Sequence, residues 1–389
     1  MKLSKRLKLI PPYLFVKIEE KKEQLVKQGI DVIDFGIGDP DLPTPEHIFK
    51  KMHEILESKN ASQYPSSKGE LSFRQAVANW YKARFNVELD PANEICTLIG
   101  SKEGLAHLPL CFIDAGDIAL VPDPSYPVYK ICTTLAGGEP FLLPLTVENN
   151  FLPELDKIPA NILKKAKLLF INYPNNPTGA VADLTFFEKA VGFAKKHDLL
   201  LVSDLAYSEM GYNGFKPHSV LEVPGAKEVC IEFHSLSKTY NMTGWRIGMA
   251  VGNKQAVQAL ATIKSNIDSG AFKAVQFAGI EALIGQQKCV EENNKIFGER
   301  AQILVNGLNS LGWKLPKSQA TFYIWVPVPK GDTSASFTEK LLDKCGILVV
   351  PGNGYGPSGE GYVRFAITLP KDRIALAIER MKKQAICFN

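Results

Sequence analysis

The sequence lacks several features that would assign it to particular classes of protein. No stretch approaches the roughly 18 uninterrupted apolar residues of a membrane-spanning helix. The net charge is only +4, and basic runs such as Lys164-Lys165 are too short to form a nucleic-acid stripe. The six histidines show no metal-ligand spacing, so no metal is expected.

Secretion signals and paired cysteines are also missing. The first six residues, Met-Lys-Leu-Ser-Lys-Arg, lack the apolar stretch of a signal peptide. The seven cysteines are odd in number, and no two have C-x-x-C spacing. We therefore expect free thiols in a reducing compartment and a cytoplasmic protein.

What is present is the composition of an ordinary globular protein, with 45% hydrophobic and 22% charged residues. A chain of 389 residues is too long for one simple core, so we expect two domains.

The middle of the chain alternates short apolar runs with helical patterns, which predicts an α/β fold with a mainly parallel sheet covered on both faces. The expected strands are Ile95–Ile99, Ile118–Val121, Leu168–Ile171, Leu199–Ser203 and Val229–His234, and the expected helices between them are Gly104–Phe112, Val128–Leu135 and Leu184–His197.

The two ends of the chain predict a second, smaller α+β domain. A helix is expected at Phe15–Gly29, a strand at Val32–Gly36 and a long amphipathic helix at Gln287–Leu311. Later strands and helices alternate at Thr321–Val326, Ser334–Lys344, Ile347–Val349, Tyr362–Ile367 and Lys371–Lys383. We predict a large domain over residues 46–285 and a small domain made of residues 1–45 and 286–389.

The segment after the last of the central strands carries the densest chemistry. Ser235, Ser237, Lys238 and Arg246 place two hydroxyls, an amine and a guanidinium within twelve residues. Hydroxyls and a planar arginine suit a phosphate, and a deprotonated lysine can capture an aldehyde as an imine. A Ser/Lys-rich surface turn is the alternative.

Two other strands are followed by polar segments at the same predicted sheet edge. Asn172–Gly179, which reads NYPNNPTG, contains the turn-forming residues Asn, Pro and Gly. Asp204 closes the next strand, and Tyr207 follows three residues later. A tight loop without chemistry and a helix N-cap are the respective alternatives.

The ordered set N-P-T-G at 176–179, D-x-x-Y at 204–207 and S-x-S-K at 235–238, with Arg246 eight positions on, resembles the fold-type-I aminotransferases of classes I and II. The resemblance covers nearly the whole chain. It implies pyridoxal 5′-phosphate (PLP) as cofactor and a large PLP-binding domain with a mainly parallel, seven-stranded type of sheet.

The resemblance also implies a role for each matching residue. Lys238 would hold PLP as a Schiff base and then move the proton of the 1,3 shift, while Asp204 would keep the ring nitrogen protonated so that the ring draws electrons. Asn176 and Tyr207 would bind the ring's 3-oxygen. The phosphate would be bound by Ser235, Ser237 and Arg246.

Further positions complete the implied cofactor site. Ser101 and Lys102 lie between a strand and a helix, where backbone N–H groups meet an anion, although a plain helix cap is the alternative. Tyr126 would stack on the pyridine ring, although a lone tyrosine also suits core packing. Tyr64 would reach the phosphate of a neighbouring subunit, which implies a homodimer with shared active sites.

The implied substrate contacts come largely from the small domain. Arg364 would clamp the substrate α-carboxylate, and closure of the small domain would complete the site. Gly38, Asn176 and Tyr13 are further substrate-binding candidates.

One branch of the family is especially similar, the LL-diaminopimelate aminotransferases. The segments that carry this resemblance are Pro11–Phe15, Tyr64–Gly69, Gly100–Gly104, Tyr240–Arg246 and Ser265–Phe272. The implied reaction exchanges an amino group between LL-diaminopimelate with 2-oxoglutarate and tetrahydrodipicolinate with glutamate, in lysine biosynthesis.

Such a substrate needs a distal pocket for a second ammonium and a second carboxylate. Glu103 and Asp268 are the candidate acids, and Lys102 or Lys273 could meet the far carboxylate, although each could be an ordinary surface charge. Other readings of the chain are an aspartate, alanine or aromatic aminotransferase, or a PLP-dependent C–S lyase. A DNA-binding regulator is not expected, since only about thirty residues precede the first motif.

Overall fold

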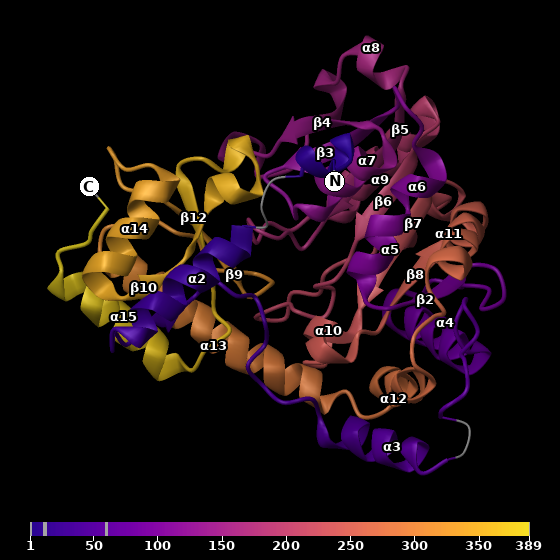
Figure 1. Ribbon diagram of the computed structural model, residues 1–389, viewed down its shortest axis with the longest axis horizontal. Helices are drawn as coiled ribbons and strands as arrows, with labels where there is room; N and C mark the ends of the chain where they lie inside the picture. The colour runs from indigo at the N-terminus through magenta and orange to yellow at the C-terminus, as the bar shows by residue number, and fades with distance from the viewer. Residues whose placement is uncertain (1, 11–13, 59–60, 389) are drawn as a thin grey trace.

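The computed structural model describes residues 2–10, 14–58 and 61–388. They form two lobes (Figure 1), of which the larger holds a seven-stranded sheet. None of the described helices combines the length and the apolar sequence needed to cross a membrane.

The seven-stranded sheet is parallel except for β8, which pairs antiparallel with both of its neighbours. The parallel pairs run through the centre of the sheet and continue to β4 at its edge. In spatial order the strands are β2 (Ile95–Leu98), β8 (Gly248–Gly252), β7 (Cys230–Ser235), β6 (Leu200–Asp204), β5 (Ala166–Asn172), β3 (Ile118–Asp123) and β4 (Glu139–Pro144).

Helices cover both faces of this sheet, as buried parallel strands require. Successive side chains of β5 serve opposite faces, because Leu169 and Ile171 join one hydrophobic cluster and Leu168 and Phe170 the other. The first cluster includes α4 (Leu71–Phe85), α9 (Leu184–His197) and α12 (Lys273–Ile284), and the second includes α5 (Ser101–His107), α7 (Val128–Ala136) and α11 (Lys254–Ile267). Shorter or peripheral helices are α1 (Lys5–Lys8), α3 (Glu46–Leu56), α6 (Pro109–Phe112), α8 (Ala160–Leu163) and α10 (Leu236–Thr239).

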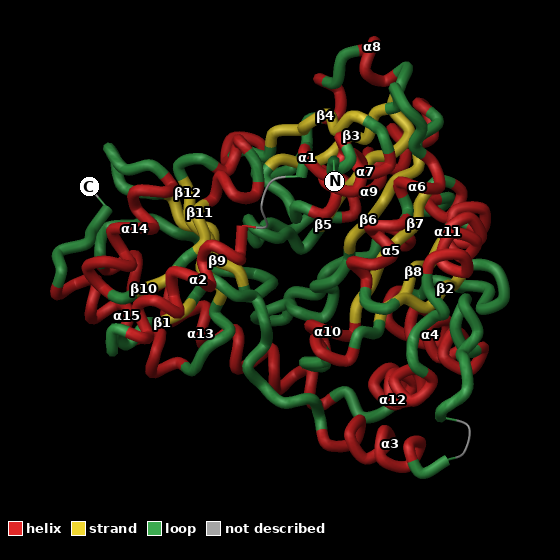
Figure 2. Tube along the Cα trace, in the orientation of Figure 1, coloured by secondary structure: helices red, strands yellow, loops and turns green. Residues whose placement is uncertain are grey.

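The smaller lobe combines the beginning of the chain with its end (Figures 1 and 2). β1 (Ile33–Asp34) pairs with β10 (Ile347–Leu348), and β11 (Val350–Pro351), β12 (Tyr362–Ala366) and β9 (Tyr323–Pro327) form an antiparallel sheet. Asp31, just before β1, binds Arg373 and Arg380. The helices of this lobe are α2 (Leu14–Lys27), α14 (Ser334–Cys345), α15 (Lys371–Lys383) and part of α13 (Lys288–Ser310), which runs from the larger lobe into the smaller one.

The smaller lobe has its own hydrophobic cluster, drawn from residues 33–35 and 297–386 together with residues 206–212 of the larger lobe. Both ends of the chain therefore share one core. The domain boundaries at residues 46 and 285 stay a prediction.

The α/β fold class is confirmed, and one expected helix is corrected. The stretch Gly104–Phe112 is not one α-helix, because α5 ends at His107 and α6 begins at Pro109. Proline has no backbone N–H to donate to the preceding turn, which interrupts the regular hydrogen-bonding pattern at this point.

Candidate active site

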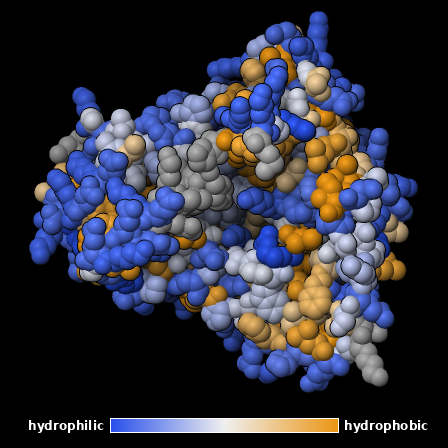
Figure 3. Space-filling model, viewed as in Figure 1, coloured by the Kyte–Doolittle hydropathy of each residue, from blue (hydrophilic) through white to orange (hydrophobic). Residues whose placement is uncertain are grey.

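The predicted site residues gather where the parallel strands end. Ser101 follows β2, Tyr126 follows β3, Asn176 follows β5, and Asp204 closes β6. Because parallel strands end at one edge of a sheet, these positions meet there, and this edge faces the smaller lobe. The surface between the two lobes is hollowed on the face shown in Figure 3.

Lys238 lies on the short helix α10, directly after β7. Its Nζ donates a hydrogen bond to the carbonyl of Gly38 at 2.8 Å and lies 5.5 Å from the centre of the Phe322 ring. Burial lowers the pKa of the Lys238 amine to about 8; the Asp39 charge opposes this shift, and Arg364 and Arg246 add to it. A neutral, nucleophilic amine is therefore accessible near neutral pH.

Asp204 is a buried carboxylate with one satisfied oxygen and one open oxygen. Its Oδ2 accepts a hydrogen bond from the Tyr129 hydroxyl at 2.6 Å. Its Oδ1 is buried and has no hydrogen-bond partner among the described residues. Burial raises the pKa of Asp204 to about 6, although the bonds from the Tyr129 hydroxyl and the Ala206 backbone act in the opposite direction. A cationic donor at Oδ1 would stabilise the charged form.

Arg364 of β12 joins the two lobes from a fully buried position. Its guanidinium donates to Oδ1 of Asn176 at 3.0 Å and to the carbonyl of Gly36 at 2.7 Å. The rings of Tyr323 and Tyr355 lie 4.2 and 5.0 Å from the guanidinium carbon. The arginine is thus held in place by polar and cation–π contacts at the edge of the sheet.

Gly38 must be a glycine for steric reasons. A side chain at this position would overlap the ring and hydroxyl of Tyr323. The absence of a side chain lets the backbone of Gly38 approach both Tyr323 and Lys238.

Three segments that were predicted to bind phosphate meet at the starts of α10 and α5. The Ser235 hydroxyl caps α10 by accepting from the Ser237 N–H at 3.2 Å. Arg246 donates to the carbonyl of Ile99 at 3.2 Å, and a side chain on Gly100 (φ +80°) would overlap its guanidinium. Arg246 therefore lies beside the first residue of α5, Ser101.

Aromatic contacts connect the remaining cofactor candidates. Lys102 Nζ lies 5.8 Å from the Tyr126 ring centre, and the Tyr126 ring packs edge-on against Tyr129 at 6.0 Å. The hydroxyls of Tyr207 and Tyr323 are 3.1 Å apart.

The other candidates make different contacts or fall outside the described residues. Tyr64 is 86% exposed, and Tyr13 falls among the residues that are not described. Glu103 and Asp268 both bind the buried ammonium of Lys264, at 2.9 and 3.1 Å. Burial opposes the charge of Glu103, but the bonds from His107 and Lys264 outweigh it and lower its pKa.

Sequence reasoning overlooked two residues that the structure places in contact with predicted site residues. Tyr129 binds Asp204, and Tyr323 contacts Gly38, Tyr207 and Arg364. The available signal for Tyr129 was its place three residues after Tyr126, in the segment between β3 and the first turn of α7. Tyr323 offered no comparable signal, because its partners are distant in the sequence.

A family model described as aminotransferase class I and II matches residues 30–381. The chain belongs to the class I and II aminotransferases. The sequence resemblance is thereby confirmed, and the protein is an enzyme that transfers amino groups.

Similar proteins of this family cover nearly the whole chain. A relative from Moorella thermoacetica, named LL-diaminopimelate aminotransferase, is 56% identical over 383 residues, which is 98% of each chain. One from Aquifex aeolicus with the same name is 54% identical over 97% of this chain and 98% of its own. A substrate-bound BacF structure from Bacillus subtilis has a TM-score of 0.96 at 36% identity, covering 100% of this chain and 99% of its own.

Proposed function

We propose that this aminotransferase uses PLP held by Lys238 to exchange an amino group between LL-diaminopimelate with 2-oxoglutarate and tetrahydrodipicolinate with glutamate, a step in lysine biosynthesis. The substrate assignment is supported by several relatives that bear the name LL-diaminopimelate aminotransferase and are 52–56% identical over 97–100% of this chain.

The open Oδ1 oxygen of Asp204 is the observation that carries the cofactor proposal. A buried carboxylate oxygen without a partner is costly, and a protonated pyridine nitrogen is a donor that would satisfy it. The lowered pKa of Lys238 suits capture of the cofactor's aldehyde. The residues present therefore fit PLP.

Bound at this site, PLP would supply an aldehyde for the amine and a ring that draws electrons from the substrate α-carbon. The Lys238 amine, once released, would take the proton from the substrate α-carbon. Asp204 would hold the proton on the ring nitrogen, and Arg364 would bind the substrate carboxylate and orient the C–H bond, assisted by Gly38 and Asn176.

The other cofactor contacts follow from the arrangement at the ends of the strands. We assign the phosphate to Ser235, Ser237, Arg246, Ser101 and Lys102, which surround the first turns of α10 and α5. Asn176 and Tyr207 would bind the 3-oxygen of the ring, and Tyr126 would stack against the ring. Tyr13 remains a candidate for substrate binding.

The assembly that we propose is a homodimer in which Tyr64 contributes to the phosphate site of the second copy. The exposure of Tyr64 supports this assignment, as do the exposed apolar side chains of Ile267 and Phe272. These flank Gly270, whose backbone packs against Pro65 and Ser66 beside Tyr64. An exposed apolar patch of this kind is typical of an interface.

A cytoplasmic location is also proposed. The thiols of Cys96, Cys111, Cys132, Cys230, Cys289 and Cys345 form no disulfide, as a reducing compartment would leave them.

A half-reaction screen tests the substrate. The yellow holoenzyme is mixed with one amino acid at a time, and loss of its visible absorbance reports amino-group transfer. LL-diaminopimelate should act fast, while aspartate and alanine act far more slowly. Equal rates with the common amino acids would replace this assignment by a broad-specificity aminotransferase, and release of a thiol would indicate a C–S lyase.

The cofactor link is tested separately. Borohydride reduction and mass spectrometry should find a phosphopyridoxyl group on Lys238, and the Lys238→Ala variant should lack both the adduct and turnover. An adduct on another lysine, or none, would overturn the cofactor proposal.

The distal pocket has its own test. If Glu103 and Asp268 bind the second ammonium, Glu103→Gln and Asp268→Asn should each raise the KM for diaminopimelate. Both acids also bind Lys264, so thermal unfolding of each variant is the control for a structural effect. Unchanged KM values in both variants would contradict this part.

A further inference from the structure

The turn that begins at Asp204 and carries Tyr207 is bordered by a cavity of about 1180 Å³. The lining comes from residues 208–209 and 211–217, from α4 and α13, from the end of α12 and from residues 317–318, and none of the described cofactor-site residues contributes to it. The turn is therefore not backed by a continuous solid core on the cavity side. Polar bonds to its neighbours must contribute to its position.

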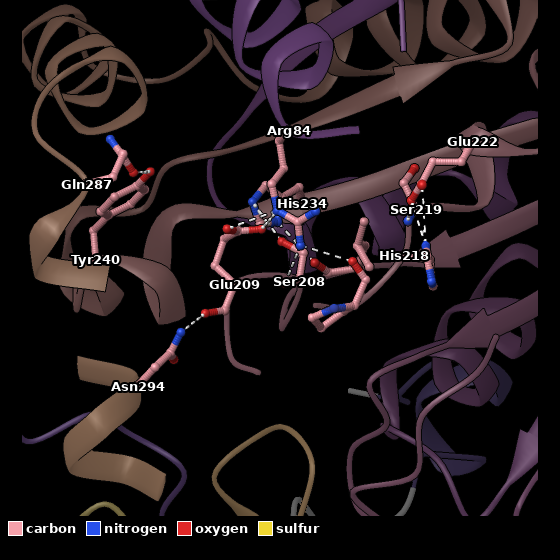
Figure 4. Close-up of polar contacts among 12 residues, drawn as sticks. Arg84, Ser208, Glu209, His218, Ser219, Glu222, His234, Tyr240, Gln287 and Asn294 are labelled. Atoms are coloured by element: carbon pink, nitrogen blue, oxygen red, sulfur yellow. Dashed lines mark hydrogen bonds and ion pairs between the residues drawn. The ribbon is translucent and has the colours of Figure 1, made fainter. Parts of the chain in front are cut away.

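Arg84 of α4 supplies the largest group of these bonds (Figure 4). Its Nε donates to both carboxylate oxygens of Glu209, at 2.9 and 3.2 Å. Its Nη2 donates to the carbonyls of Ser208 at 3.4 Å and Pro217 at 3.0 Å. One guanidinium thus binds both the end of the turn and the far end of the segment that lines the cavity. The side chains of Arg84 and Glu209 are 20% and 15% exposed.

Two further contacts attach the turn to other elements. Nδ2 of Asn294, on α13, donates to the backbone carbonyl of Glu209 at 2.7 Å (Figure 4). At the other end of the turn, Nδ1 of His234 donates to the carbonyl of Leu205 at 3.0 Å. The His234 ring is stacked on Trp80 at 4.9 Å, and burial lowers its pKa to about 4, so it is neutral.

Trp80 and Arg84 are one helical turn apart on α4, so one face of this helix supports both ends of the turn. Tyr207 lies between these two supports. Its carbonyl accepts a hydrogen bond from the N–H of Met210 at 3.1 Å, so a displacement of Glu209 is passed directly to Tyr207.

We propose that Arg84 and Glu209 are a positioning pair that fixes Tyr207 and Asp204 against the cofactor, and that Asn294 ties this pair to α13 and so to the smaller lobe. The inference rests on the cofactor roles proposed above for Asp204 and Tyr207. It adds residues that touch neither cofactor nor substrate.

The test uses the PLP-loaded enzyme and the variants Glu209→Gln, Arg84→Met and the double variant. Because small displacements at an active site are costly, each single variant should lower kcat by about tenfold or more, with the KM for the amino donor changed much less. The double variant should be no worse than the poorer single variant, since the two side chains act as one unit. Asn294→Leu should act in the same direction with a smaller effect.

A spectroscopic readout separates positioning from stability. The visible circular dichroism of bound PLP reports the orientation of its ring, and we expect it to change in the Arg84 and Glu209 variants. Arg84→Lys, which keeps the charge, should restore part of the signal. The matched control is Lys82→Met, which breaks the exposed ion pair between Lys82 of the same helix and Glu88 beyond its end, and should alter neither signal nor kcat.

The outcomes are distinguishable. Variants with a lowered melting temperature but wild-type kcat and dichroism would overturn the positioning role. Additive kcat losses in the double variant would overturn the proposal that Arg84 and Glu209 act as one unit. If Arg84→Met does not fold, the near-isosteric Glu209→Gln carries the test alone. A wild-type protein that holds no PLP would overturn the proposed function, and this inference with it.

Discussion

Two buried carboxyl groups on neighbouring strands of the large sheet differ in how many hydrogen bonds the chain supplies to them. This difference distinguishes a structural carboxyl group from a functional one. Asp204 closes β6 and Glu232 lies within β7, and burial raises the pKa of the first to about 6 and of the second to about 7. Glu232 accepts four hydrogen bonds, which come from the hydroxyls of Tyr81, Ser203 and Ser219 and from the Val220 N–H. Asp204 receives one side-chain bond and keeps a buried oxygen open.

The difference shows how a fold can leave a polar group at a ligand site without its full set of hydrogen bonds. A carboxyl whose hydrogen bonds are supplied by the chain itself holds segments together, as Glu232 holds α4 and residues 219–220 to the sheet. A carboxyl left open at a strand end is less well satisfied by the chain, and a bound partner can supply the missing bond.

The largest expected effect is on catalysis at Asp204. Asp204→Asn keeps the shape but removes the charge that would hold the ring proton, so kcat should fall by about a hundredfold to a thousandfold. Steady-state transamination measures this loss. Glu232→Gln should leave kcat within about twofold of wild type if that carboxyl is purely structural. A similar kcat loss in both variants would erase the distinction.

The converse experiment concerns stability. Glu232→Ala would leave three buried hydroxyls and one N–H without their acceptor and should cost about 3 kcal/mol of unfolding free energy. Asp204→Ala should cost less, because it removes the acceptor of fewer donors, the Tyr129 hydroxyl and the Ala206 N–H. Denaturant unfolding of the cofactor-free proteins provides the measurement. A larger loss at Asp204 than at Glu232 would contradict the interpretation.

Both raised pKa values make stability depend on pH in the same direction. Between the unfolded and folded pKa values the folded state binds more protons, so each carboxyl lowers the unfolding free energy as pH rises. The windows are from about 4 to about 6 for Asp204 and from about 4.5 to about 7 for Glu232. Each contribution amounts to about 3 kcal/mol.

The amide side chains of Asp204→Asn and Glu232→Gln do not ionise, so the variants do not lose unfolding free energy in this way. As pH rises from 4 to 8, each variant should therefore gain stability relative to wild type. Unfolding curves at a series of pH values measure the gain. Addition of PLP should remove the contribution of Asp204 alone, because its ring nitrogen would stabilise the carboxylate. Loss of both contributions, or of neither, would argue against a ligand at Asp204.

The smallest expected effect compares two tyrosines. Tyr129→Phe removes the hydroxyl bound to Asp204 and should lower kcat about fivefold, since one hydrogen bond contributes about 1 kcal/mol. Tyr81→Phe removes a hydroxyl from Glu232 and should change stability by a similar free energy without changing kcat. Measured kcat values should therefore fall in Tyr129→Phe, and the melting temperature should change in Tyr81→Phe while its kcat stays the same. A kcat loss in Tyr81→Phe would contradict the comparison.

The α/β class was predictable because the central strands are short and apolar and some helices, such as α9, have an apolar face. Helices α3, α4, α11 and α12 were not expected, and the apolar residues of α4 and α12 are spread around the helix. Helix α9 begins and ends at Leu184 and His197, as expected. Strand β8 was not expected, since its sequence Gly-Met-Ala-Val-Gly offers weak β propensity and its place depends on pairing with distant β2 and β7.

The site was predictable where chemistry and sequence spacing coincide. Asp204, Lys238 and Asn176 were found from motifs that follow strands, and the structure places them at one edge of the sheet. The contacts of Arg364 with Asn176 and of Arg84 with Glu209 join residues 188 and 125 positions apart, and only the folded chain reveals such pairs. The bond of Glu103 to Lys264, 161 positions away, was missed for the same reason.

The pairing of β1 with β10, reinforced by Asp31 and its two arginines, has a consequence for how the chain is made. During synthesis the segment around Asp31 emerges from the ribosome long before Leu348 and Arg380, its partners. The larger lobe can begin to fold in the meantime, whereas the smaller lobe must wait for the last helix. Nascent chains halted before β10 would therefore lack the strand that pairs with β1, and chains halted before α15 would lack the two arginines that bind Asp31.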